Sequence, residues 1–125
     1  MPRHRPQIED LGAVISHRAL PDGVPVFDTD GRHVGVVDQA MEDPVTGIFE
    51  GIVIHTRPLP GRHLFADYEQ IAEIRERGVQ LSVSADELYE LSGRSRRRHG
   101  GELDTPERPL ERRLRRAWDW ITGFR

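Results

Sequence analysis

Short runs of strand-forming residues, separated by turns that contain glycine or proline, constrain the fold of this chain more than any other feature. The clearest turn is Asp30-Gly31, which lies between two β-rich runs and is therefore a strong hairpin signal. Further turns near residues 42–47 and 58–61 contain both proline and glycine. The six predicted strands cover residues 24–27, 33–41, 48–56, 63–67, 72–77 and 79–83.

The spacing of these runs predicts a mainly β domain. No long helix separates the six strands, which favours a small antiparallel barrel or sandwich and disfavours parallel βαβ units, because these need crossover helices. The run Ile52-Val53-Ile54 is apolar at consecutive positions, which is typical of a strand buried on both faces. A capping box of Ser84 and Glu87 predicts a short helix after the last strand, reaching Leu91.

Charge and composition divide the chain further. Residues 1–93 hold 8 Arg against 16 acidic residues, and residues 94–125 hold 10 Arg against 5, so an acidic body precedes a basic tail within a net charge of −3. We predict a lead-in over residues 1–19, a β domain over 20–91, a flexible linker over 92–105 and a helix over 106–125. The tail either folds back on the acidic body or binds an anionic partner.

Composition also excludes some functions. The chain has no cysteine, so disulfides, thiolate zinc sites and cysteine nucleophiles are absent. No stretch approaches the roughly 20 apolar residues of a membrane-spanning helix, and residues 1–10 lack the apolar core of a secretory signal. We therefore expect a cytoplasmic protein.

The order of the predicted elements resembles the PRC-barrel family. The resemblance begins with residues 23–38, where an apolar strand, the Asp30-Gly31 turn, Val34-Gly35 and Val37 follow one another. Residues 48–56, 65–71 and 78–81, together with Ile74, are similar to the later elements of the family, so that the resemblance covers about residues 20–91.

The resemblance implies a fold and a role as a docking surface. Members of the family are small β-barrels, found in the cytoplasmic domain of the photosynthetic reaction centre H subunit and in a ribosome maturation factor, where they act as docking surfaces. Because residues 1–125 show neither the membrane span of the former nor the N-terminal domain of the latter, we expect neither specific role to transfer to this chain. The family shares no catalytic motif, so the resemblance implies no catalytic residue here.

The C-terminal segment predicts a basic amphipathic helix. Either Pro106 or Pro109 can start it, and Gly123 can stop it. At 100° per residue an apolar stripe forms, with the two tryptophans at its edges and arginines over much of the remaining surface. The stripe and its edges comprise Leu110, Leu114, Ala117, Trp118, Trp120, Ile121 and Phe124, and the arginines are Arg112, Arg113, Arg115 and Arg116.

Three uses of this helix remain open from the sequence. Apolar helical faces usually pack within their own protein or on a second subunit. The stripe also suits a groove on another protein, with the four arginines as contacts to an anionic partner. Tryptophans at its edges and flanking arginines suit an anionic membrane surface, at the inner face of the membrane.

Other candidate sites are weaker. His55 and His63 flank the third turn and could face each other across a hairpin, but a metal site needs a third ligand that the pattern does not supply. Asp28-Thr29-Asp30-Gly31 is not a calcium loop, because its glycine comes too early. The run Arg94–Arg98 is read as a solvated linker, since the acidic body would repel nucleic-acid phosphates.

These observations predict a non-enzymatic adaptor without cofactor, metal or catalytic residues. Its barrel would offer a docking surface, and its C-terminal helix would bind another protein or a second copy of the chain. The alternatives are a peripheral membrane protein anchored by the same helix, and a barrel that binds a small ligand or a metal.

Overall fold

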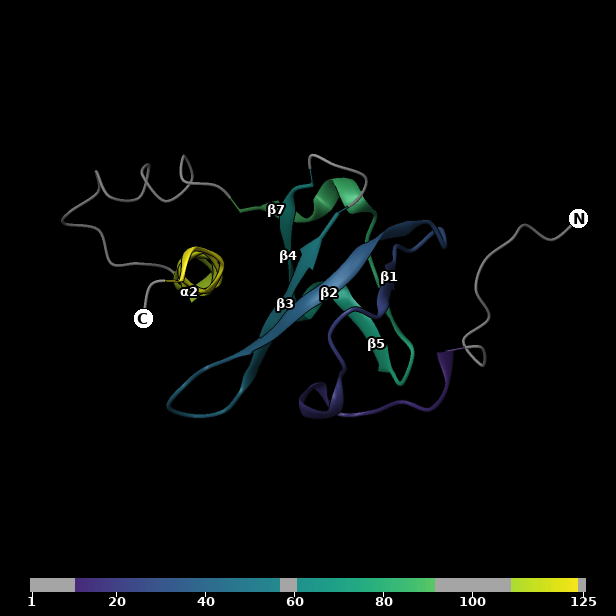
Figure 1. The fold of residues 1–125 in the computed structure, drawn as a ribbon, viewed down its shortest axis with the longest axis horizontal. Helices are drawn as coiled ribbons and strands as arrows, with labels where there is room; N and C mark the ends of the chain where they lie inside the picture. The colour runs from purple at the N-terminus through teal and green to yellow at the C-terminus, as the bar shows by residue number, and fades with distance from the viewer. Residues whose placement is uncertain (1–10, 57–60, 92–108, 124–125) are drawn as a thin grey trace, which may run out of the picture.

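A computed structural model describes residues 11–56, 61–91 and 109–123 of the chain. These residues form seven strands, three short 3-10 helices and one α-helix (Figure 1). The strands are β1 (Pro25–Phe27), β2 (His33–Glu42), β3 (Phe49–His55), β4 (His63–Asp67), β5 (Ile71–Arg75), β6 (Gly78–Leu81) and β7 (Tyr89–Glu90). The helices are η2 (His17–Ala19), η3 (Tyr68–Gln70), η4 (Ala85–Glu87) and α2 (Pro109–Thr122).

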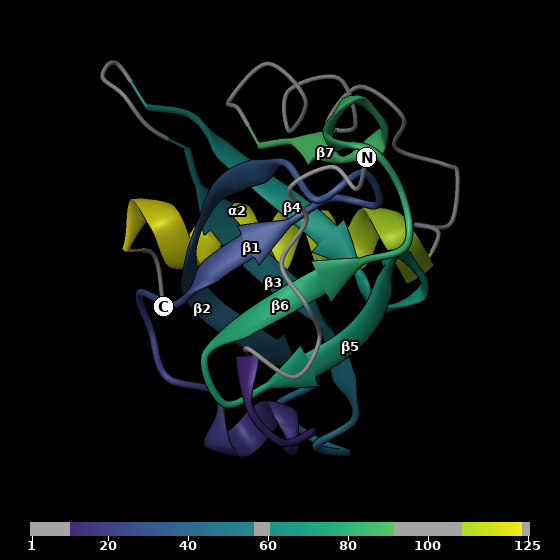
Figure 2. The same ribbon diagram turned by 90° about the vertical axis from the view of Figure 1, so that its right-hand side faces the viewer.

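The seven strands form one sheet in the order β5-β6-β1-β2-β3-β4-β7, and the sheet curls into a half-barrel (Figure 2). The mainly β prediction is therefore confirmed, but the sheet is mixed rather than antiparallel, because β1 pairs with β6 in parallel. In the β1–β2 hairpin, β2 pairs with only one edge of β1. Strand β6 pairs with the other edge and satisfies the backbone hydrogen-bonding groups of β1 on that side.

The first hairpin forms where Asp30-Gly31 predicts it. Gly31 has φ 85°, which suits glycine, and its N–H donates to the carbonyl of Asp28. The buried Asp28 carboxylate accepts hydrogen bonds from the backbone N–H groups of Asp30 and Arg32, each at 2.9 Å. The turn is thus fixed by its own polar groups.

Of the predicted helix from Ser84 to Leu91, only the 3-10 helix η4 forms, and the prediction is wrong for the residues after it. Ser84 precedes the 3-10 helix η4, but its side chain makes no capping hydrogen bond, and the chain is extended again at Leu88. Leu88 packs against the barrel core, and Tyr89–Glu90 pairs with β4 as a seventh strand. Burial and strand pairing therefore override the local helical signal.

The strand β3 is buried on both faces, as its apolar run predicts. Ile52 and Ile54 belong to the cluster that fills the half-barrel, with Val26, Val37 and Leu81. Val53 points to the opposite side and belongs to a second cluster. The sheet therefore has two apolar faces, one toward the barrel interior and one toward the outside.

The described part of the lead-in, residues 11–19, packs on the barrel. Leu11 is buried, Val14 bridges to Arg75, and the N–H of Ile15 donates to the carbonyl of Ile74. These residues cover the outer edge of β5, which would otherwise expose unpaired backbone groups.

Candidate functional site

The candidate site is the side of the sheet that faces away from the barrel interior. Four buried apolar side chains form it, Met41 on β2, Val53 on β3, Phe65 on β4 and Leu91 after β7. We call these four residues the outer face. Val53 and Phe65 are both 0% exposed, although they lie outside the half-barrel. Another segment of the chain must therefore shield Val53 and Phe65 from solvent.

The helix α2 covers the outer face (Figure 1). Its Ala117 is 0% exposed and belongs to the same cluster as the outer face. Leu114, Trp118, Trp120 and Ile121 pack around it against the same cluster. The helix ends where Gly123, with φ 82°, follows Thr122, as the sequence predicts.

Two buried carboxylates hold one flank of α2. Asp67, the last residue of β4, accepts a hydrogen bond of 2.7 Å from Nε of Arg113. Glu50 on β3 accepts one of 3.0 Å from Nε of Arg116 at Oε1 and a second, shorter one from Nη2 at Oε2. The guanidinium of Arg113 also lies 5.2 Å from the centre of the Tyr68 ring.

A β-bulge places Glu50 on this side of the sheet. Between β2 and β3, Met41 pairs with Gly51 and Glu42 pairs with Phe49, so Glu50 has no partner in β2. An extra residue of this kind interrupts the alternation of side chains. The carboxylate consequently reaches α2 instead of following Ile52 and Ile54 into the barrel.

A third carboxylate lies beside the other two. Oδ2 of Asp43, which follows β2, is 3.9 Å from Nη2 of Arg116. Its pKa lies below the usual 3.8, mainly because the backbone N–H of Thr46, and then that of Val45, donates to it. Asp43, Glu50 and Asp67 thus lie at the same end of three neighbouring antiparallel strands, and we call them the acidic border.

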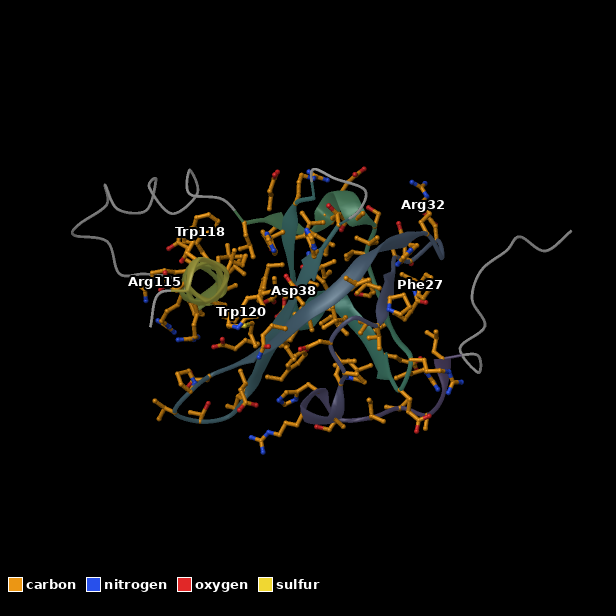
Figure 3. All side chains as sticks on the ribbon, viewed as in Figure 1. Phe27, Arg32, Asp38, Arg115, Trp118 and Trp120 are labelled. Atoms are coloured by element: carbon orange, nitrogen blue, oxygen red, sulfur yellow. The ribbon has the colours of Figure 1, made fainter. Side chains whose placement is uncertain are left out.

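The predicted partner-binding residues divide between two environments. Leu114, Trp118, Trp120 and Ile121 pack on the chain's own outer face, and Leu110 is partly exposed. Among the arginines, Arg113 and Arg116 pair with the acidic border, whereas Arg112 and Arg115 are exposed. In Figure 3, Arg115 points away from the sheet. Phe124 and the linker over 92–105 lie outside the described residues.

Sequence reasoning missed Glu50 and Asp67. The acidic body and basic tail indicate mutual attraction, but nothing in the pattern distinguishes these two carboxylates from the other fourteen acidic residues of residues 1–93. Only their position at the ends of buried strands sets them apart.

The predicted histidine pair does face across the β3–β4 hairpin. His55 and His63 are register partners, and their rings stack with centroids 4.9 Å apart. Nε2 of His63 lies 3.2 Å from Oδ2 of Asp38, which Figure 3 labels in the middle of the sheet. Among the described residues, no group of three or more His, Cys, Asp or Glu side chains is arranged to hold a metal ion.

A cleft of about 520 Å³ lies at the end of the barrel near the β1–β2 turn. Arg32 and Arg62 line it together with Asp86 and Glu90. Arg62 lies 3.6 Å from Glu90, so part of this charge is already compensated within the chain. The cleft therefore presents no single sign of charge to a ligand.

Within the described part of the chain, no helix has the length and apolar character needed to cross a membrane. No protein-family model matches the sequence, and no curated protein matches it.

Proposed function

We propose that this chain is a non-enzymatic binding module, a PRC-type barrel whose outer face docks amphipathic helices. Its own α2 occupies the face, and binding of a partner protein or of a second copy would use the same chemistry. We further propose that it works in the cytoplasm.

The observation that carries this proposal is the combination of apolar and charged contacts under α2. The outer face buries a helical stripe around Ala117, and Glu50 and Asp67 each accept a hydrogen bond from an arginine of that helix. A groove that takes the apolar face of an amphipathic helix is a recurring mode of peptide recognition. Charged pairs at the edge add specificity to such a groove.

The membrane alternative uses the same apolar stripe. Trp118 and Trp120 are partly buried against the cluster that contains Phe65, so their full insertion into a lipid surface would require α2 to leave the sheet. That step would expose Val53 and Phe65 to water, at a cost that follows the apolar area uncovered. Docking of a helix therefore explains the stripe with fewer steps than membrane binding does.

The test is binding in trans by a chain that ends at Gly93. A labelled peptide of residues 106–125 should bind this shortened chain, measured by fluorescence anisotropy, because the outer face is then uncovered. The same peptide should bind the complete chain far more weakly, because α2 competes for the face. Circular dichroism of the shortened chain verifies that the barrel is folded.

Two results would count against the proposal. One is a folded, shortened chain that does not bind the peptide. The other is sedimentation of the complete chain with anionic vesicles at low salt, which would favour the membrane alternative instead.

A further inference from the structure

The acidic border has a geometry that matches a particular helix. Adjacent strands of a sheet lie about 4.8 Å apart. Three residues of an α-helix rise about 4.5 Å along its axis. A helix that crosses the strands can therefore offer one side chain to each strand when those side chains are three residues apart.

The contacts of α2 follow this spacing. Arg113 reaches Asp67 on β4, and Arg116, three residues later, reaches Glu50 on the neighbouring β3. Nη2 of Arg116 also approaches Asp43, which follows β2, the next strand. The helix thus runs across the strands from β4 toward β2, with its two arginines along the acidic border.

The two carboxylates are too deeply buried to tolerate an uncharged helix. Glu50 is 7% exposed and Asp67 is 5% exposed. A buried carboxylate without a cationic partner is strongly unfavourable. A helix with an apolar stripe but no arginine at these positions would bury both carboxylates without a cationic partner. The acidic border therefore disfavours binding of such helices and favours binding of helices that carry the two arginines.

Arginine suits these positions better than lysine. Arg116 donates from Nε to one oxygen of Glu50 and from Nη2 to the other, a fork that matches the carboxylate. The ammonium group of lysine cannot make this planar contact. Ala117, next to Arg116, is fully buried in the cluster of the outer face, which favours a small residue at this position of the helix.

We propose that the outer face selects its partner by charge and spacing. It binds an amphipathic helix that carries two arginines three residues apart on one flank of its apolar stripe, with a small residue directly after the second arginine. The chain's own α2 meets this description and competes with the partner helix. This inference rests on the proposed function, since it specifies which helices the face accepts.

The experiment uses the complete chain with Arg113→Glu and Arg116→Glu, which should release α2 by repulsion from the acidic border. Three labelled peptides of residues 106–125 are compared by anisotropy: the native peptide, one with Arg113→Gln and Arg116→Gln, and one with Arg112→Gln and Arg115→Gln. The last two peptides carry the same net charge. Only the peptide with Arg113→Gln and Arg116→Gln lacks the arginines that contact Glu50 and Asp67 in the structure.

The native peptide and the Arg112→Gln/Arg115→Gln peptide should bind the released chain with similar affinity. The Arg113→Gln/Arg116→Gln peptide should bind about thirtyfold or more weakly, as expected when one side of two buried charge pairs is lost. Equal affinities of the two substituted peptides would overturn the inference and leave the proposed function standing. Failure of all three peptides to bind would contradict both.

A second measurement guards against misfolding of the released chain. Trp118 and Trp120 are the only tryptophans, so tryptophan fluorescence reports directly on the docking of α2. Adding Glu50→Arg and Asp67→Arg to the Arg113→Glu/Arg116→Glu chain reverses both pairs and should restore the native fluorescence. A spectrum that stays unchanged by the reversal would refute selection by charge.

Discussion

A double-mutant cycle on Arg116 and Glu50 measures how strongly the acidic border holds α2. The side chains are 27% and 9% exposed, and two hydrogen bonds join them. Hydrogen bonds to charged groups contribute about 1.5–3 kcal/mol. Because Arg116 keeps Asp43 nearby when Glu50 is removed, we expect a coupling energy of about 1.5–2 kcal/mol, toward the lower end of this range.

The chain contains a matched control pair. Arg62 and Glu90 lie 3.6 Å apart, with side chains 59% and 55% exposed, and such surface pairs contribute about 0.2–1 kcal/mol. Each alanine variant and each double variant is unfolded in urea, followed by tryptophan fluorescence for α2 and by circular dichroism for the sheet. A coupling for Arg116–Glu50 no larger than that of the control pair would refute the argument from burial.

Two further predictions concern the strands that carry the border. Gly51→Ala should destabilise the fold by about 2 kcal/mol or more, because a Cβ there would lie 2.3 Å from the carbonyl oxygen of Ala66. Gly23 also has a positive φ, 88° against 148° for Gly51, but a Cβ on Gly23 would meet open space, so Gly23→Ala should cost less in thermal unfolding. A hydrogen bond from His17, the largest cause, holds the pKa of Glu42 below its usual 4.5. Its stabilising contribution is therefore complete above about pH 4.5 and is lost as the pH falls through the lowered value. The loss of thermal stability in Glu42→Gln should accordingly shrink between pH 6 and pH 3, and a loss independent of pH would contradict this assignment.

Local patterns predicted the elements whose causes are local. The Asp30-Gly31 turn forms because a few neighbouring backbone groups satisfy one another. The end of α2 at Gly123 and the apolar stripe depend only on helix geometry. The run Ile52-Val53-Ile54 predicted burial on both faces, although not what would lie on each side.

Long-range pairing explains where the predictions failed. The residues after Ser84 carry a helical signal, but the free edge of β4 takes Tyr89–Glu90 as a strand. The parallel pairing of β1 with β6 joins segments more than fifty residues apart in the chain. Neither outcome follows from any property of the short segment alone.

The sequence by itself determined six of the seven strands, the first hairpin and an amphipathic helix with opposite charge to the body. Only the tertiary structure decided that α2 covers the outer face and that Glu50 and Asp67 receive its arginines. The reason is physical. Hydrophobic periodicity is set by residues that are neighbours in the sequence, whereas the burial of a carboxylate here depends on the bulge in β3 and on the distance between adjacent strands. The chain's most specific feature, arginines spaced to match its strands, therefore appears only when helix and sheet are seen together.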